Sequence, residues 1–328
     1  WTTVHNGDGQ GDLSENNWPV IEPTYGGNDI MANGYITQLE DLGGSPQPHA
    51  YGGIVRSEDD GSNWIAATTP ILTPTGPGSG IIWPAPMGGR AFVYRNGVWL
   101  AIGITPIGAT WIDYPYALDV TSVLKSTDAG QGWNFWGTVP YNGGFSPVSV
   151  AYGNGVYVAI CGGETVVDPY TIMRSTDNGF TFVGVVRQDE VLKSDYPNSI
   201  AFGGDKFVTA LGSYSEDNGA TWHDCETCPP LDASQPHSII YTGDAFIIVG
   251  SKISLFSLDG IHFESVPTVQ LTDITLDIEG WREVALADGN LVAVGAEVGS
   301  GSNTRTMLAP WPPVAATVYN SHGPSGAA

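Results

Sequence analysis

Four polar side chains occupy one equivalent position in a repeated sequence pattern, at the entry to successive predicted strands. They are Arg90, Asn198, His237 and Arg282, and Val148 holds the same position in a fifth copy. Guanidinium, imidazole and amide groups together suit a carboxylate or the hydroxyls of a sugar. We therefore predict a ligand-binding site at these residues; a channel lining satisfied by water is the alternative interpretation.

Aromatic residues outside the repeated turns lie near the same strand entries. They are Tyr25, Trp83, Phe145, Tyr196 and Trp281. Sugar rings stack on aromatic faces through their C–H groups, so we add Trp83, Tyr196 and Trp281 to the predicted binding residues. Packing within the fold is the alternative role for aromatic residues at strand ends.

Catalytic chemistry has little support in the sequence. It contains no Gly-x-Ser-x-Gly, no His-Glu-x-x-His and no phosphate-binding loop. Glycoside cleavage needs two placed carboxyl groups, and the 34 acidic residues cannot be paired from sequence. Asp29, Asp195 and Glu283 lie near strand entries and are the candidates for such work. The sequence favours a protein that is not an enzyme.

One segment near the N-terminus resembles a calcium loop. Its oxygen-bearing side chains alternate with glycines: Asn6, Asp8, Gln10 and Asp12. Asn17 stands where such a loop normally has a bidentate Glu. We expect no cofactor and interpret the segment as a solvated Gly/Asp loop; structural calcium is the alternative.

The three cysteines divide into two kinds. Cys161 follows an apolar run and is predicted to be a small buried residue. Cys225 and Cys228 form a Cys-x-x-Cys pair in a loop. We expect a local disulfide in an oxidising compartment; a zinc site that borrows His223 is the weaker alternative.

A turn motif that occurs five times is expected to position the predicted site residues. It reads Ser, one residue, Asp, one residue, Gly, two residues and an aromatic residue, and the fifth copy is one residue shorter. The copies are Ser57–Trp64, Ser126–Trp133, Ser175–Phe182, Ser215–Trp222 and Ser257–Phe263, and we call them Asp turns 1 to 5. Ser and Asp side chains can bond backbone N–H groups two or three residues on. The Gly supplies a positive φ, and the aromatic packs between units.

The aspartates of these turns are therefore expected to be structural: Asp59, Asp128, Asp177, Asp217 and Asp259. Arg56, Lys125 and Arg174 precede the serines of three copies. We interpret these basic residues as strand residues beside the turn and not as a site.

A second repeat precedes the Asp turn in each unit: an apolar strand, a short polar turn and another apolar strand. The predicted turns fall at Gly34, Gly97, Gly155, Asp205, Asp244 and Gly289. Asn-Gly and Gly-Asp between apolar runs are hairpin signals. Each unit is thus two hairpins, or four strands.

Six such units predict a six-bladed β-propeller, with seven blades as the alternative, in a single domain over 1–328. In the last unit Thr304–Ala309 is expected to be the third strand. Trp1–His5 and Val314–Tyr319 are candidate strands to close the ring, with residues 1–27 helping closure and 320–328 forming a flexible tail. The first residue is Trp1, so we expect that a leader was removed or that the chain is part of a longer one.

The turn phrase resembles the Asp-box, or bacterial neuraminidase repeat, of sialidases, sortilin-type receptors, xyloglucanases and many bacterial and phage surface proteins. The resemblance covers roughly residues 28 to 309 and implies a propeller, in which the box lies between the two outer strands, away from the usual site. A sialidase would also need an arginine triad and an early Arg-Ile-Pro segment. This chain has no Arg-Ile-Pro, and several of its few arginines belong to the repeats, among them Arg95 in a hairpin turn.

The composition limits the partners. Eleven basic residues against 34 acidic ones give a net charge of −23. This charge repels nucleic acid, whose binding depends on basic contacts to phosphate. No apolar run approaches the roughly 20 residues that span a bilayer, so membrane insertion is not expected.

Three functions fit these observations. The first is a non-catalytic propeller for recognition or adhesion, with a glycan or other surface ligand, secreted or on a virion surface. The second is a carbohydrate-active enzyme, a glycoside hydrolase or polysaccharide lyase, that uses the channel mouth. The third is a structural module of a larger extracellular or virion assembly. We favour the first.

Overall fold

The computed structural model describes residues 21–26, 28–40, 47–59, 63–69, 71–72, 85–86, 91–102, 121–139, 146–162, 172–185, 199–227, 236–250, 253–265, 278–287, 290–297 and 304–310. Within these ranges every element is a β-strand, and neighbouring strands pair antiparallel in sheets of mostly three or four strands. The all-β prediction is confirmed. The chain divides into two compact units, Trp1–Arg187 and Gln188–Ala328.

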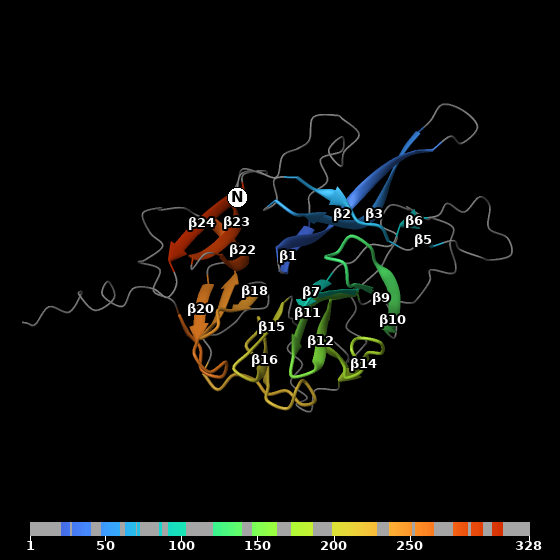
Figure 1. Ribbon diagram of the computed structural model, residues 1–328. Helices are drawn as coiled ribbons and strands as arrows, with labels where there is room; N and C mark the ends of the chain where they lie inside the picture. Colours follow the sequence, from blue (N-terminus) through green and yellow to red (C-terminus); the bar gives the residue numbers. More distant parts are fainter. Residues whose placement is uncertain are drawn as a thin grey trace, which may run out of the picture. The chain divides into compact units, whose positions relative to one another are not determined.

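The N-terminal unit contains three four-stranded sheets and one small ribbon (Figure 1). The first sheet is β1 (Ile21–Gly26), β2 (Asp29–Glu40), β3 (Gln47–Ser57) and β4 (Ile65–Ala66). The second is β7 (Ala91–Arg95), β8 (Val98–Ile102), β9 (Thr121–Ser126) and β10 (Asn134–Val139). The third is β11 (Ser146–Gly153), β12 (Val156–Gly162), β13 (Ile172–Ser175) and β14 (Val183–Val185). The ribbon pairs β5 (Ile71–Leu72) with β6 (Ala85–Pro86).

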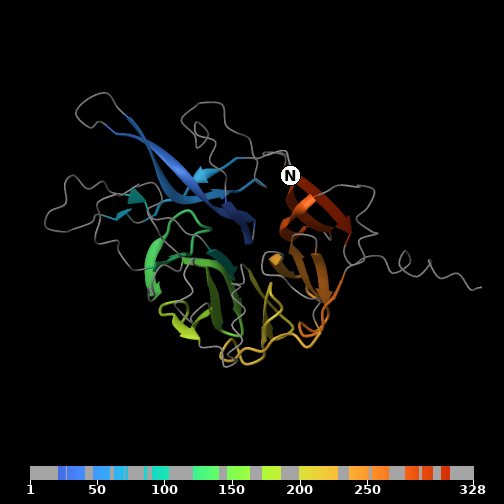
Figure 2. The ribbon, with the colours of Figure 1, turned by 180° about the vertical axis from the view of Figure 1, so that it is seen from behind.

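The C-terminal unit contains three further sheets, coloured yellow to red in Figure 2. The fourth sheet is β15 (Ile200–Gly203), β16 (Lys206–Thr209) and β17 (Tyr214–Ser215). The fifth is β18 (Pro236–Tyr241), β19 (Phe246–Gly250), β20 (Ile253–Ser257) and β21 (Glu264–Ser265). The sixth is β22 (Ile278–Ala287), β23 (Asn290–Glu297) and β24 (Thr304–Pro310). The predicted third strand of the last unit is therefore present as β24, whereas Trp1–His5, Val314–Tyr319 and the tail lie outside the described residues.

One predicted turn is wrong. Gly34 does not turn the chain but lies inside β2, where it pairs with Gly53 of β3. The first hairpin joins β1 to β2, and its register pairs Gly26 with Asp29. The turn signal of Asn33-Gly34 is overridden because these residues pair with Ile54 and Gly53 in the long β2–β3 ladder.

Three other hairpins, β7–β8, β11–β12 and β15–β16, have two consecutive turn residues with positive φ. At Asn96-Gly97 and at Asn154-Gly155 both residues have positive φ, from 47° to 85°, as type I′ turns require. In four hairpins two aromatic residues, with four residues between them around the turn, face each other across the strands, with ring centroids 4.7 to 5.0 Å apart. The pairs are Tyr94–Trp99, Tyr152–Tyr157, Phe202–Phe207 and Tyr241–Phe246.

Each Asp turn is held by side-chain hydrogen bonds. The Ser hydroxyl donates to the Asp carboxylate at 2.6 to 3.0 Å in all five turns. The same hydroxyl accepts the N–H of the Gly at 2.8 to 3.0 Å in turns 2 to 5. The carboxylate accepts a further N–H, four residues on in turns 1 to 4 and three in turn 5, at 2.8 to 3.0 Å. The bonds to Ile261 and His262 in turn 5 span the predicted two and three residues, whereas the longest bond in turns 1 to 4 spans one residue more.

Asp turns 2, 3 and 5 also contact the sheet that precedes their own in the chain. A side chain at Gly130 would collide with Met31 of β2, one at Gly179 would lie 2.5 Å from Leu100 of β8, and one at Gly260 2.9 Å from Val208 of β16. These glycines are thus required both for positive φ and for contact.

Backbone hydrogen bonds continue this contact between sheets. Thr68 donates to the carbonyl of Gln131 and accepts from Trp133, both at 2.8 Å. In the C-terminal unit Phe263 donates to the carbonyl of Thr227 at 2.7 Å. The same arrangement recurs in both units because the same turn phrase recurs.

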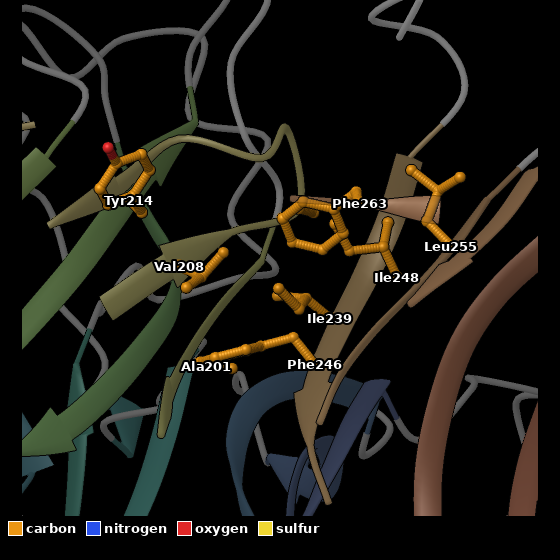
Figure 3. Packing of buried hydrophobic residues seen from close by; sticks show 9 residues of the cluster. Ala201, Val208, Tyr214, Ile239, Phe246, Ile248, Leu255 and Phe263 are labelled. Atoms are coloured by element: carbon orange, nitrogen blue, oxygen red, sulfur yellow. The ribbon is translucent and has the colours of Figure 1, made fainter. Parts of the chain in front are cut away.

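The aromatic residue that ends the turn lies in the core in Asp turns 2 to 5, whereas Trp64 of Asp turn 1 is half-buried. Trp133, Phe182, Trp222 and Phe263 are buried. Figure 3 shows Phe263 beside Phe246, Ile248 and Leu255 of its own sheet, with Val208 from the sheet before. Separate hydrophobic clusters therefore lie between the first and second, the fourth and fifth, and the fifth and sixth sheets, as expected for faces that cannot be buried alone.

Replacement of Gly137 by Ala tests the packing of β10 against Asp turn 3. A Cβ there would collide with the backbone carbonyl of Phe180, so we expect a loss of about 1–3 kcal/mol in the free energy of unfolding from overpacking. Gly155→Ala is the control, because φ is +84° there but no atom lies within 4 Å; its cost of about 1–2 kcal/mol is conformational alone. Denaturant midpoints measure both, and an unchanged midpoint for Gly137→Ala contradicts this packing.

The Asp turns also predict acid sensitivity. Hydrogen bonds, chiefly the one from the Ser126 hydroxyl, lower the pKa of Asp128. Burial acts to raise the pKa of Asp177, but the hydrogen bonds from Thr181 and Ser175 outweigh it, so that this pKa is also lowered. The pKa values of the other three turn aspartates are lowered as well. A folded-state pKa below the unfolded value means that the stabilisation is present above about pH 4 and is lost as the pH falls further.

Unfolding by denaturant at a series of pH values measures this effect. The free energy of unfolding should decrease below about pH 4, and Asp177→Asn should weaken that decrease because one titrating carboxyl is removed. A free energy that stays constant down to about pH 3 argues against the hydrogen bonds described for the turns.

Candidate functional site

A cavity of about 220 Å³ is lined by two neighbouring sheets of the N-terminal unit. The second sheet contributes residues from the β7–β8 hairpin, β8 and β9, and the third contributes residues from β12 and Asp turn 3. The lining residues are Arg95, Asn96, Val98, Leu100, Lys125, Tyr157 and Asn178. Strand register explains the grouping, because Arg95 pairs with Val98 and Leu100 pairs with Lys125.

Arg95 is the last residue before the β7–β8 turn. Its guanidinium carbon lies 4.1 Å from the centroid of the Tyr152 ring, and its side chain hydrogen-bonds to Tyr157. Tyr152 and Tyr157 face each other across the β11–β12 hairpin. Burial raises the pKa of Tyr157, and Arg95 acts in the opposite direction. The phenol is therefore neutral near neutral pH and can accept and donate hydrogen bonds.

Lys125 is held in a similar way in β9 of the same sheet. Its Nζ lies 3.7 Å from the centroid of the Trp136 ring. The Trp136 Nε1 donates to the carbonyl of Asn178 at 2.9 Å, and its ring meets Phe180 edge-on at 6.0 Å. Each contact of a cation with an aromatic face contributes about 0.5–1 kcal/mol at exposed sites. Both positive side chains are thus positioned by rings of the protein itself.

No carboxylate lines the cavity among the described residues. The ion pairs found among the described residues involve other basic side chains. They are Arg56 with Asp29 and Glu58, Lys206 with Glu216, and His262 with Asp259 and Glu226. Two of only eleven Lys and Arg residues therefore face one cavity in a chain with net charge −23.

Sequence reasoning missed this site. It placed Arg95 in a hairpin turn and Lys125 in the strand before an Asp turn, and both local positions are as predicted. Their convergence depends on how the second and third sheets pack, which the sequence repeats do not reveal. One feature of the sequence could have indicated the site. The β7–β8 hairpin has Arg95 at the position where the other hairpins have Gly153, Gly203 or Thr242.

The predicted ligand-binding residues are only partly covered by the structure. Arg90, Asn198, Trp83 and Tyr196 lie outside the described residues, as do the proposed calcium ligands Asn6, Asp8, Gln10 and Asp12. His237 is the second residue of β18. Trp281 and Arg282 lie in β22, where the register shifts between Trp281 and Glu283. The grouping of these residues remains a prediction.

Two of the three suggested catalytic carboxyl groups are described. Burial raises the pKa of Asp29, whose Oδ1 lies 3.9 Å from Arg56 Nη1. Burial alone raises the pKa of Glu283. Asp195 lies outside the described residues.

Glu283 occupies a position where three earlier repeats have serine, namely Ser149, Ser199 and Ser238. The Ser199 hydroxyl accepts the N–H of Ile239 at 3.3 Å, and the Ser238 hydroxyl accepts the N–H of Val284 at 3.4 Å. These bonds join β15 to β18 and β18 to β22. No hydrogen bond or ion pair of the Glu283 carboxyl is found among the described residues, so a titratable group replaces a structural hydroxyl.

The cysteines behave as two classes. Cys161 is a free buried thiol, and burial raises its pKa to about 12. Cys225 is disulfide-bonded and packs against the core of the C-terminal unit. A disulfide sulfur is not a thiolate ligand, so this state of Cys225 does not bind zinc. Cys228 lies outside the described residues.

Among the described residues the structure contains no helix that is long and apolar enough to cross a membrane, and no cluster of three metal-ligating side chains.

Comparison with known proteins identifies no family for this chain. The sequence matches no protein-family model and no curated protein. Among solved structures, that of YCF48 bound to D1 peptide is similar with 17% identity and a TM-score of 0.44, over 80% of this chain and 74% of that one. A protein of unknown function from Dyadobacter fermentans is similar with 14% identity and a TM-score of 0.46, over 88% and 75% of the two chains. Similarities this weak assign neither a family nor a function.

Proposed function

We propose that this chain is an Asp-box β-propeller that recognises glycans without chemically converting them. Each of the six sheets is one blade. The first strands of consecutive sheets lie side by side, β7 between β1 and β11 in one unit and β18 between β15 and β22 in the other (Figure 1). Adjacent first strands are what a radial arrangement requires, because innermost strands converge on the axis.

The Asp turns support the same arrangement. Asp turns 2, 3 and 5 pack their glycines on the second strand of the sheet before them. A fixed contact repeated from sheet to sheet gives a constant rotation between neighbours, as blades need. The prediction of six blades, with seven as the alternative, rests on the six repeated sequence units.

The cavity between the second and third sheets carries the functional proposal. Arginine, lysine, two asparagines and a tyrosine converge there, and none of its described lining residues is a carboxylate that could serve as catalytic acid or base. Hydrogen-bond donors held on rigid turns suit recognition of a polar ligand. The predicted channel-mouth residues Arg90 and Arg282 form the second proposed contact region.

The proposed setting is extracellular, either secreted or on a virion surface, within a larger assembly. A disulfide at Cys225 fits an oxidising compartment, and the net charge of −23 favours solubility and discourages contact with nucleic acid.

A glycan array combined with a product-release assay tests the function. Binding without release is the expected result. If the glycan binds in the cavity, the double variant Arg95→Ala, Lys125→Ala should abolish binding. If it binds at the channel mouth, the double variant Arg90→Ala, Arg282→Ala should abolish binding instead. Absence of binding to any glycan would contradict the proposal and favour a structural module.

A carbohydrate-active enzyme is the second candidate, and Glu283 is the observation that favours it. A carboxyl group with a raised pKa can stay protonated and act as a general acid in glycoside cleavage. Its place on a first strand, at a position where other repeats carry serine, is consistent with a role beyond packing.

Glu283→Gln tests this alternative, since Gln keeps the shape of the side chain but cannot transfer a proton. If the chain is a glycosidase, product release should fall by about a hundredfold or more with binding retained. Asp205→Asn, in an exposed hairpin turn, is the matched control and should leave release unchanged. Absence of release by the unmodified chain rejects the enzyme.

A further inference from the structure

We propose that the saccharide bound at the cavity is acidic, with a carboxylate placed between Arg95 and Lys125. This inference rests on the proposed function, since it names the chemical class of ligand at the same site.

The first argument is charge. Arg95 and Lys125 line one cavity, and neither forms an ion pair with a carboxylate among the described residues. The chain has three acidic residues for every basic one, so a pair of cations without acidic neighbours is unusual here. Their mutual repulsion would be relieved by an anion bound between them.

The second argument is that both cations are already positioned. The guanidinium lies on Tyr152 at 4.1 Å and the ammonium on Trp136 at 3.7 Å. The turn that carries Arg95 is fixed by the positive φ of Asn96 and Gly97. Side chains that are ordered before binding lose less entropy when the ligand arrives.

The third argument is the neutral lining. Asn96, Asn178 and Tyr157 offer amide and phenol groups next to the cations, which suits a ligand that combines one charge with several hydroxyls. The volume of about 220 Å³ is below the roughly 300–1,000 Å³ of drug-sized sites. A single sugar unit is therefore the expected occupant.

An acidic peptide is the competing ligand, and strand pairing disfavours it. Peptides commonly add to an unpaired sheet edge. The lining strands β8, β9 and β12 are each paired on both sides, with β7 and β9, with β8 and β10, and with β11 and β13. The strand that carries Arg95, β7, is an edge strand of its sheet, and it lies against β1 and β11 of the neighbouring sheets. The lining therefore offers side chains rather than a free backbone edge.

Calorimetric titration with galacturonic acid and with galactose provides the test, because the two sugars differ only at the C6 carboxylate. The acid should bind at least about tenfold more tightly, as charge-assisted hydrogen bonds are lost in galactose. Arg95→Ala and Lys125→Ala should each weaken binding of the acid by about tenfold to a hundredfold. Arg95→Lys keeps the charge and should weaken it less than Arg95→Ala.

Lys206→Ala is the matched control. It removes one positive charge from a lysine that is paired with Glu216 at 3.3 Å in the C-terminal unit, so it changes the net charge equally but leaves the cavity intact. Unchanged binding by this variant supports a local role for Arg95 and Lys125. Thermal unfolding of each variant confirms that it is folded.

The outcomes separate the two proposals. If both sugars bind equally, or if Arg95→Ala and Lys125→Ala bind the acid as well as the unmodified chain does, the acidic-ligand inference is overturned while glycan recognition stands. If neither sugar binds and the glycan array is also empty, the proposed function itself fails. Binding of a tetra-aspartate peptide in place of the sugar acid would assign the cavity to a peptide and overturn the inference.

Discussion

The hydrogen bonds of the Asp turns are the constraint on which the rest of this structure depends. One serine hydroxyl donates to the carboxylate and accepts from the glycine N–H, while the carboxylate accepts a second N–H further along. The turn is thereby closed without help from a neighbouring strand. A closed turn presents a fixed surface, and in Asp turns 2, 3 and 5 that surface packs on the second strand of the preceding sheet.

This arrangement links local chemistry to assembly. The glycine must have no side chain both because φ is positive and because Leu100 lies where a Cβ would be at Gly179. The aromatic that follows is buried between the same two sheets. One short phrase therefore fixes the turn, the spacing between sheets and part of the shared core, which explains why it can be copied while the connecting loops vary in length.

The candidate site uses the same framework for a different purpose. Asp turn 3 supplies Asn178 to the cavity and, through its Asn178 carbonyl, holds Trp136, on which Lys125 rests. Rigid turns thus position polar groups that no turn needs for its own stability. Binding groups on a stable all-β framework are a common division of labour, in which the sheets provide rigidity and the connections provide chemistry.

The sequence alone determined the all-β class, the repeated hairpins and the Asp turns, because these depend on interactions within about eight residues and each phrase carries its own donors and acceptors. It failed at Gly34, where pairing with β3 outweighed a local turn signal. Only the tertiary structure placed the Arg95 side chain on the Tyr152 ring and the Lys125 side chain on the Trp136 ring. Only it showed that the serine hydroxyls of other repeats bond to the next sheet at the position that Glu283 occupies. These features depend on which strands become neighbours, and contacts between residues distant in the sequence are set by packing rather than by any local pattern.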